Sequence, residues 1–412
     1  MRCPSIQRVI PHGILGDVVR EWCGDGPGGG AVGEPVEIGT EYAWVDQRTI
    51  YDAMRGRCPV AREGGSWVIL GHAEVVSAAT DPDTFSSRVT DRRALPNSLD
   101  GAEHRAYREL VDHYFTEERV AREEPRCRRH AVAIVDGLPH GVTVKTIASI
   151  GVPYAVRSQS SWLGWSPDLE TELVEWMAAN RAATRSGDRA RTAEVAERFD
   201  QMIRGLIEAR RATPTSDVTS ELMGETVHRR PLTDEELVSI LRNWTAGDLG
   251  SLATSVGVIV HFLASRPVVQ REVRALVEAG DHAGLEAAAE EILRIDDPFV
   301  SNRRVATRDV ELAGETIPEG GRLLLNWTAA NRDPLVFGNP DAYHPRANRP
   351  ANLVFGIGPH VCPGRSLTLM ELRVVLEELL GRTRWIEPAS DRPAVREKPP
   401  VGGWARVPVV LH

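Results

Sequence analysis

One cysteine lies in a glycine-rich segment whose residue types could bind a metal. Residues 355–364 read FGIGPHVCPG, with Cys362 in the eighth place. Apolar residues recur at helical spacing beyond this segment, so we expect a helix to begin just after the cysteine. The partial positive charge and free N–H groups of a helix N-terminus would favour a thiolate, which is the form of cysteine that binds a metal. The alternative is an inert cysteine buried in a turn.

This segment resembles the haem-binding loop of the cytochromes P-450, which are haem-thiolate monooxygenases. The resemblance implies that haem b (iron protoporphyrin IX) is the cofactor and that Cys362 is the iron ligand. It also implies a mainly α fold with small β-sheets, shaped like a triangular prism, in which haem lies between a long central helix and the cysteine loop. The family pattern is matched at all six fixed positions, which are Phe355, Gly356, Gly358, His360, Cys362 and Gly364.

The composition narrows the class of protein further. The 412 residues carry a net charge of −9, which argues against a nucleic-acid partner. We find no linker in the middle of the chain, so we expect one catalytic domain over 41–412 after a partly flexible N-terminal arm at 1–40. No apolar run approaches the length of a membrane span, and the start of the chain has no signal-peptide pattern. We therefore expect a soluble, cytoplasmic, bacterial-type enzyme without a membrane partner.

A long helix is predicted over residues 233–265. Thr233 and Glu236 form a capping box at its start, and Pro267 closes it. A polar, glycine-containing break lies at its middle, over residues 245–251. Each glycine inside a helix lowers helix stability by about 1 kcal/mol relative to alanine. We therefore expect that some neighbouring group needs to approach the backbone closely there. A cofactor plane packed near Ala246 would explain the break, and a helix–helix crossing is the alternative.

The same break departs from the family pattern, which usually reads Ala-Gly-x-Asp/Glu-Thr and relays protons to dioxygen. Here the acid position holds Leu249 and the alcohol position holds Gly250, while Asp248 and Ser251 are each one step, roughly 100° around the helix, away. We therefore expect no standard hydroxylation relay. Either water and substrate groups supply protons, or the reaction is an oxidative coupling in which oxygen leaves as water. The catalytic candidates are Gly247, Asp248, Gly250 and Ser251.

Haem carries two propionates, and four residues resemble the family's propionate ligands. His104 and Arg108 match the pattern His-x-x-x-Arg, Arg304 follows the helix near residue 295, and His360 precedes the cysteine by two positions. Arginine suits a carboxylate because its fork donates two parallel hydrogen bonds. Any one of these residues alone could be an ordinary surface cation.

A helix is also expected near residues 284–295, where Glu291 and Arg294 match the family's Glu-x-x-Arg pair. In the family this pair braces the core behind the haem loop. The third partner of the pair falls on Ala347 by alignment from Phe355. Arg346 is the substitute that we expect after a one-residue shift, and Arg349 is a weaker candidate.

The resemblance implies an oxidoreductase that oxidises a small organic secondary metabolite with O₂. Electrons would come from a ferredoxin and its reductase. Coupling of aromatic or indole rings, such as those of tryptophan-containing cyclic dipeptides, is a specific expectation. The alternatives are a haem sensor or carrier without turnover and a haem-free helical scaffold. Trp244 could equally be plain core, and the expected substrate pocket consists of Asn243, Trp244, Phe299 and Val300.

Overall fold

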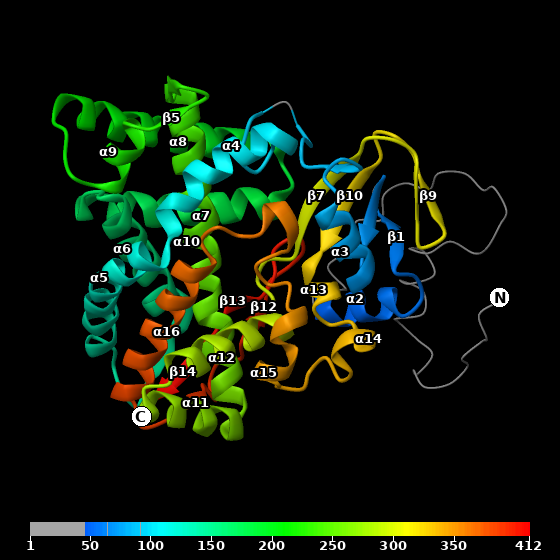
Figure 1. The fold of residues 1–412 in the computed structure, drawn as a ribbon. Helices are drawn as coiled ribbons and strands as arrows, with labels where there is room; N and C mark the ends of the chain where they lie inside the picture. Colours follow the sequence, from blue (N-terminus) through cyan, green and yellow to red (C-terminus); the bar gives the residue numbers. More distant parts are fainter. Residues whose placement is uncertain (1–45, 64, 91) are drawn as a thin grey trace.

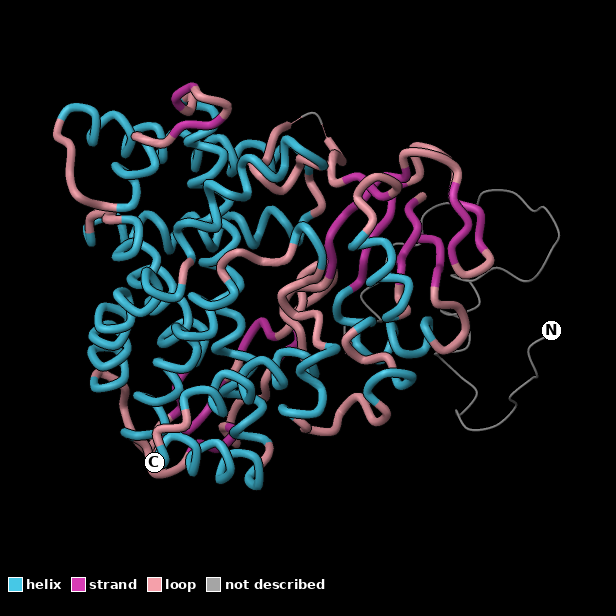
Figure 2. Tube along the Cα trace, in the orientation of Figure 1, coloured by secondary structure: helices cyan, strands magenta, loops and turns pink. Residues whose placement is uncertain are grey.

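The computed structural model describes residues 46–63, 65–90 and 92–412, and it is mainly helical with small sheets, as predicted. Helices form the larger part of the molecule, and a five-stranded sheet with short helices forms a smaller part beside it (Figure 1). The tube view separates these two parts by secondary structure (Figure 2). The expected N-terminal arm at 1–40 lies outside the described residues.

The larger part contains the long helices, and the predicted 284–295 helix is one of them. Shorter helices accompany the sheet and the segment before the cysteine loop. The helices are α2 (Gln47–Arg55), α3 (His72–Thr80), α4 (Gly101–Asp112), α5 (Glu117–Asp136), α6 (Val152–Leu163), α7 (Glu170–Ser186), α8 (Arg189–Ala212), α9 (Val218–Met223), α10 (Asp234–Ser265), α11 (Pro267–Ala279), α12 (His282–Ile295), α13 (Trp327–Ala330), α14 (Pro334–Phe337), α15 (Pro345–Asn348) and α16 (Arg365–Arg382).

The five-stranded sheet has the order β1-β2-β10-β7-β3, and only the β2–β10 pair in it is parallel. A second sheet has the order β11-β14-β4, and the remaining strands form two-stranded pairs. The strands are β1 (Val60–Glu63), β2 (Ser66–Ile69), β3 (Phe85–Ser86), β4 (Thr143–Lys145), β5 (Thr226–Val227), β6 (Arg230–Pro231), β7 (Ser301–Ala306), β8 (Val310–Leu312), β9 (Glu315–Ile317), β10 (Arg322–Asn326), β11 (Ile386–Pro388), β12 (Val395–Arg396), β13 (Trp404–Arg406) and β14 (Pro408–Leu411).

Helix α10 is the predicted long helix and runs through the centre of the helical part. Its capping box is present, because the Thr233 side chain accepts from the Glu236 N–H and the Glu236 side chain accepts from the Thr233 N–H. By length and composition α10 could cross a membrane, so the prediction that no such run exists was wrong. However, 67% of its most apolar window is buried inside the protein. The helix is apolar because it is surrounded by other helices.

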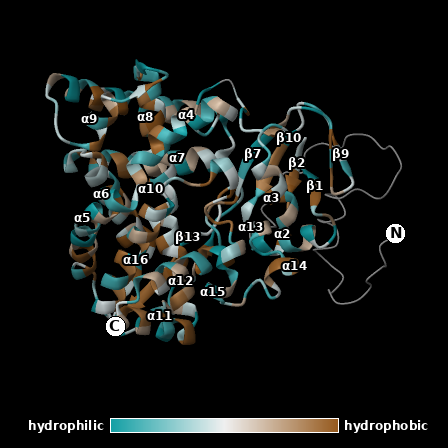
Figure 3. Ribbon diagram, viewed as in Figure 1, coloured by the Kyte–Doolittle hydropathy of each residue, from teal (hydrophilic) through white to brown (hydrophobic). Residues whose placement is uncertain are grey.

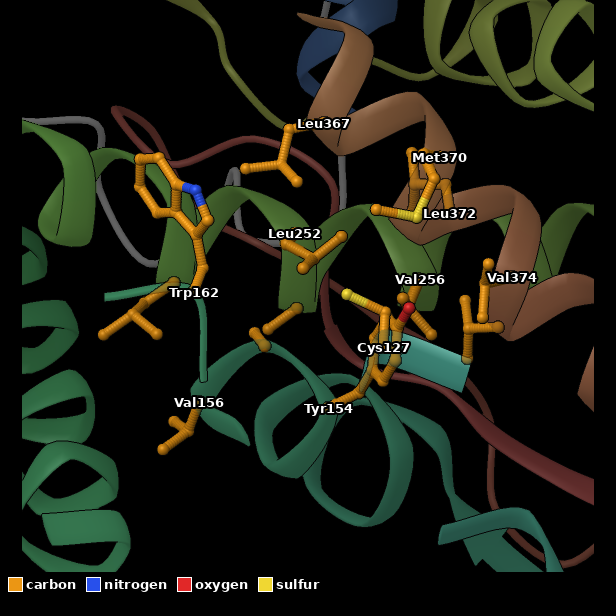
Figure 4. Packing of buried hydrophobic residues seen from close by; sticks show 14 of the residues in the cluster. Cys127, Tyr154, Val156, Trp162, Leu252, Val256, Leu367, Met370, Leu372 and Val374 are labelled. Atoms are coloured by element: carbon orange, nitrogen blue, oxygen red, sulfur yellow. The ribbon is translucent and has the colours of Figure 1, made fainter. Parts of the chain in front are cut away.

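The main core lies where α5, α6, α10 and α16 pack together. Hydrophobic residues are frequent along α16 (Figure 3). Figure 4 shows Tyr154 of α6, Leu252 of α10 and Met370 of α16 in this core, and all three are buried. The segment before α6 packs closely against α10 at two glycines, Gly151 of that segment and Gly257 of α10. A Cβ on Gly257 would lie 2.5 Å from the Ile147 side chain. A second, smaller core lies under the five-stranded sheet.

Candidate active site

A large cavity lies between α10 and the segment that holds Cys362. It contains about 1450 Å³ of space between atoms, its open mouth included. Most of the predicted site residues line it, and these are Asn243, Trp244, Gly247, Asp248, Ser251, Phe299, Arg304, Phe355, Gly356, His360, Cys362 and Gly364.

The cysteine loop is held in shape by backbone hydrogen bonds and by glycine. The Cys362 N–H donates to the Phe355 carbonyl over 2.9 Å. Gly358 has a φ of +77°, and a Cβ there would lie 2.7 Å from the Ala79 carbonyl oxygen, so only glycine fits. Helix α16 begins at Arg365, just after the cysteine, as predicted.

The protonation state of the Cys362 thiol does not follow the expectation from the helix N-terminus alone. Burial raises the pKa of the thiol to about 11, although a backbone hydrogen bond from Gly364 acts in the opposite direction. Desolvation of a charged sulfur therefore outweighs the helix end. A bound metal cation would reverse this balance, because a coordinating thiol is deprotonated outright. Proton release on metal binding is the expected consequence.

The glycines in the middle of α10 border open space, unlike those at its helix crossings. No protein atom lies within 4 Å of a Cβ built on Gly247 or on Gly250. Gly247 faces the cavity opposite Cys362. The bare backbone and the lone sulfur on the facing wall suit a flat cofactor with one protein ligand. Among the residues described, no group of three or more His, Cys, Asp or Glu is arranged to hold a metal ion by itself.

The structure corrects our prediction for the acid and alcohol positions of α10. Asp248 and Ser251 line the cavity, whereas Gly250 and Ala246 lie outside the lining and Leu249 is fully buried in the core. The Ser251 hydroxyl donates to the Gly247 carbonyl over 2.6 Å. Of the catalytic candidates, Gly247, Asp248 and Ser251 therefore lie on the face of α10 that meets the cavity, and Gly250 does not.

Asp248 is the acid on this wall of the cavity. Its Oδ2 is buried and has no hydrogen-bond partner among the described residues. Desolvation raises the pKa of the Asp248 carboxyl to about 7. A carboxyl with a pKa near the working pH can both give and take a proton, which general acid–base chemistry requires.

The effect of Asp248→Asn on stability is expected to grow with pH. Because the folded-state pKa of about 7 lies above the ordinary value of 3.8, the folded protein keeps a proton that the unfolded chain loses, and stability falls as pH rises through this window. The variant lacks this loss. Relative to the wild type, the free energy of unfolding of the variant should rise by on the order of 4 kcal/mol between about pH 4 and about pH 8. Urea unfolding measures this, and a difference independent of pH would contradict it.

Arg304 of β7 is a buried cation at the edge of the cavity. Its side chain donates to the Arg303 carbonyl over 2.8 Å. No described carboxylate lies within ion-pair distance of its guanidinium, and Asp100 attracts it only at longer range. A buried guanidinium without an anion is costly, so the site suits a ligand carboxylate such as a haem propionate.

The other three predicted propionate ligands gather beside the cysteine loop. The rings of His104 and His360 lie 4.2 Å apart. The Nε2 of His104 is buried without a partner, and burial lowers the pKa of its imidazole to about 4. His104 is therefore neutral at pH 7 and suits a hydrogen bond better than an ion pair. Arg108 donates to the Val361 carbonyl over 2.6 Å and braces the loop from outside the cavity lining.

Replacing Arg304 with glutamine is expected to weaken haem binding by about ten- to a hundredfold, because a hydrogen bond to a charged group contributes roughly 1.5–3 kcal/mol. Transfer of haem from the holoprotein to an excess of a haem acceptor measures the dissociation rate. Arg303→Gln is the matched control, because successive residues of a strand point to opposite faces. Equal dissociation rates for the two variants would contradict the assignment.

The Glu291–Arg294 pair is buried, and Asn348 is the third partner instead of an arginine. Arg294 donates to both carboxylate oxygens of Glu291, over 2.8 and 3.0 Å. The Asn348 amide donates to Glu291 Oε1 over 2.7 Å. Arg346 is exposed and Arg349 pairs with Glu290, so both expected candidates were wrong. The neutral amide of Asn348 is sufficient as the third partner, because the Glu291 carboxylate already has Arg294 as its counter-ion.

Three of the four residues of the predicted substrate wall line the cavity. Phe299 lines the cavity, whereas Val300 lies outside the lining and its carbonyl accepts from the Trp327 N–H over 2.8 Å. Asn243 lines the cavity, and its amide fastens α10 to the Leu95 carbonyl over 2.6 Å. Trp244 both lines the cavity and belongs to the core.

Several lining residues were missed because they come from distant helices. The Trp162 ring of α6 lies 5.2 Å from the Trp244 ring and 5.0 Å from the Phe115 ring, measured between centroids. Gln159 and Asp297 also line the cavity. Nothing in their local sequence separates them from ordinary helical or loop residues, so only the tertiary packing reveals that they line the cavity.

Comparison with known proteins identifies the family. The cytochrome P-450 family model matches residues 182–409. Cytochrome P-450 130 of Mycobacterium tuberculosis is 30% identical over 382 residues, which cover 86% of this chain and 93% of the relative. Cyclomarin C epoxidase CymV of Salinispora arenicola is 28% identical over 355 residues, covering 81% and 88% of the two chains.

Among solved structures, a mutant of P-450 EryK in complex with erythromycin B superposes with a TM-score of 0.80 at 27% identity, covering 89% of this chain and 96% of that chain. The predicted fold class is thereby confirmed. The loop around Cys362, the bare face of α10 and the unpaired Arg304 fit haem b, which the family binds. The chain belongs to the cytochrome P-450 family of haem-thiolate monooxygenases.

Proposed function

We propose that this enzyme oxidises a small, neutral, aromatic secondary metabolite in the bacterial cytoplasm, with O₂ and electrons from a ferredoxin and its reductase. The observation that carries the proposal is the aromatic wall, defined as Phe115, Trp162 and Trp244, which faces the cavity. Aromatic rings pack favourably edge-to-face or offset against such a wall.

The polar groups around the cavity support a neutral substrate. The amide of Asn243 is already bonded to Leu95, and the side-chain oxygen of Asn302 accepts from the Trp327 indole over 2.8 Å. Burial raises the pKa of the Asp297 carboxyl well above its ordinary value. In its protonated form, which burial favours, Asp297 offers one O–H donor that could orient a substrate carbonyl.

Oxygen insertion is the reaction that the site supports best. Haem, when bound, supplies the activation of O₂. This chain holds the proton-donating groups, Asp248 and Ser251, on the wall that faces Cys362. Relatives with printed activities include a linalool 8-monooxygenase and a cyclomarin C epoxidase, and both names describe insertion of oxygen.

Oxidative coupling of aromatic or indole rings, as in tryptophan-containing cyclic dipeptides, is the second candidate. The aromatic wall favours coupling, because it would hold a substrate ring that has lost an electron against the rings of Phe115, Trp162 and Trp244. The balance is two R–H, one O₂, two electrons and two protons giving R–R and two waters. A non-catalytic haem sensor or carrier is the third candidate, and no described feature favours it.

The experiment is turnover of the holoenzyme with a surrogate ferredoxin and reductase under ¹⁸O₂. Aromatic metabolites, including tryptophan-containing cyclic dipeptides, are first screened by the spectral shift that they induce. A product carrying one ¹⁸O supports insertion, and a product that has lost two hydrogens without gaining oxygen supports coupling. Absence of both products across ligands that bind would overturn the proposal in favour of the sensor.

A matched pair of variants tests the aromatic wall. Trp162→Leu should weaken the binding of aromatic ligands about two- to tenfold, because a ring pair contributes roughly 0.5–1.5 kcal/mol beyond the area it buries. Trp176→Leu replaces a tryptophan that is equally buried but stacks on Phe199 outside the cavity lining. Equal affinities for the two variants would contradict the role of the wall.

A further inference from the structure

Two buried polar side chains that line the cavity have no hydrogen-bond partner within the described part of the chain. Gln159 of α6 is only 1% exposed, and both its amide oxygen and its amide nitrogen are unpaired. The indole N–H of Trp244 on α10 is buried and also unpaired. Both residues border the cavity. Because buried polar groups in folded proteins are nearly always bonded, these atoms require a partner that enters the cavity.

Gln159 lies next to the aromatic wall. Trp162 follows it by three residues on α6, so the two side chains share one face of this helix. The Trp162 ring lies beside α10 (Figure 4), and its centroid is 5.2 Å from that of the Trp244 ring. The unpaired amide and the unpaired indole N–H therefore belong to the part of the cavity where we expect an aromatic substrate to bind.

Haem does not supply the missing bonds. Its hydrogen-bonding groups are two propionates, and an ionised carboxylate only accepts hydrogen bonds. A propionate therefore leaves the amide oxygen of Gln159 without a donor. Arg304 and His360, which suit propionates, come from β7 and from the cysteine loop, whereas Gln159 comes from α6. The partner of Gln159 has to donate one hydrogen bond and accept another.

We propose that Gln159 recognises a cis-amide in the substrate, as found in a lactam ring, and that the Trp244 N–H donates to a carbonyl of the same molecule. The inference rests on the proposed function, and it names the polar group that the neutral aromatic substrate carries. Gln159 is then a specificity-determining residue on a helix that the sequence pattern did not connect with the substrate.

The chemistry of a primary amide explains why the recognised group is a cis-amide. The Gln159 side chain presents one acceptor and one donor side by side. It can form two parallel hydrogen bonds only with a ligand that also presents a donor and an acceptor side by side. A lactam does so, because its ring holds the N–H and the C=O on the same side. A linear secondary amide is trans and directs the two groups to opposite sides.

The same reasoning favours a neutral ligand over a charged one. An ammonium group only donates and a carboxylate only accepts, so each would leave one atom of the Gln159 amide unpaired. A buried charge without a counter-ion is also far more costly than a buried amide that is fully hydrogen-bonded. A lactam satisfies both atoms of Gln159 and adds no charge to the cavity.

Calorimetric titration of the holoenzyme with three aromatic probes tests the proposal without turnover. The probes are a benzyl-substituted valerolactam, the benzyl-substituted cyclohexanone of the same shape, which lacks the N–H, and the linear N-methyl amide of phenylpropanoic acid. We expect the lactam to bind about five- to a hundredfold more tightly than the other two. Each of the others leaves a buried atom of Gln159 unpaired, and that loss corresponds to a factor of this size.

Variants of the two residues separate their contributions. Gln159→Leu keeps the bulk of the side chain without its polar atoms, and it should bind the lactam and the ketone equally. Ser158→Ala is the matched control, because it also removes an unpaired buried group from α6, but at a residue outside the cavity lining. It should keep the preference of the wild type. Trp244→Phe keeps a ring without the N–H, and it should weaken the lactam and the ketone alike by about two- to tenfold.

Two results would overturn the proposal. One is equal affinity of the wild type for the lactam and the ketone, and the other is a wild-type preference that persists in Gln159→Leu. Either result would mean that water alone completes the bonds of Gln159. The proposed function would survive both, because aromatic probes still bind. If none of the three probes binds the wild type, the proposed function fails and this inference fails with it.

Discussion

Replacing Cys362 with serine is expected to abolish oxidation while leaving a folded protein. We propose that the cysteine is the protein's iron ligand, and a thiolate ligand pushes the electron density that O–O cleavage needs. Loss of a group that merely supports a metal ligand costs about ten- to a hundredfold in metal affinity or activity. Loss of the ligand itself should therefore cost more than a hundredfold in turnover. Product formation per haem, measured with the surrogate redox partners, is the readout.

Cys58→Ser is the control for this substitution. Cys58 lies after α2, outside the lining of the cavity, and should be replaceable without loss of turnover. Circular dichroism should show that both variants keep the wild-type helix content. A Cys362→Ser protein with wild-type turnover would remove the basis for the haem-thiolate assignment.

Replacing Arg294 with leucine is expected to lower the free energy of unfolding by about 3–5 kcal/mol, because breaking a buried ion pair leaves an unpaired charge. Arg294 is fully buried. Besides Glu291 it bonds the Asn331, Pro340 and Ala342 carbonyls, which belong to the segment before the cysteine loop. Haem content should fall together with stability, since that segment supports the loop. Urea unfolding and the haem-to-protein ratio measure the two effects.

Arg382→Leu is the matched control for Arg294→Leu. Arg382 pairs with Asp136 at the exposed end of α16, and such surface pairs contribute about 0–1 kcal/mol. The glutamine variant of Glu291 should resemble Arg294→Leu, because it leaves the guanidinium without its carboxylate. If Arg294→Leu unfolds at the same urea concentration as Arg382→Leu, the buried pair does not brace the core.

The sequence predicted those parts of the site that depend on local geometry. The loop around Cys362, the capping box at Thr233 and the pair Glu291–Arg294 each lie within one turn or one helix. Their spacing therefore fixes their geometry. The positions of His104, Arg304 and His360 came from the family resemblance; Arg304 and His360 line the cavity, and the ring of His104 lies 4.2 Å from that of His360.

The predictions that failed depend on contacts between distant elements. Which face of α10 meets the cavity follows from packing against α6 and α16, and the family pattern, which places the acid and alcohol at Leu249 and Gly250, does not reveal that Asp248 and Ser251 line the cavity. Asn348 was missed because an amide and a guanidinium can serve the same carboxylate, and sequence pattern alone searched for an arginine. The raised pKa of the Cys362 thiol likewise reflects burial, which the loop sequence does not reveal.

The central claim is that the sulfur of Cys362 ligates haem iron, and one spectrum tests it most directly. The purified holoprotein is reduced under carbon monoxide and its Soret band is compared with that of the Cys362→Ser variant. Thiolate ligation predicts the strongly red-shifted band of a haem-thiolate protein in the wild type, and its loss in the variant. The same band position in both proteins would contradict the account.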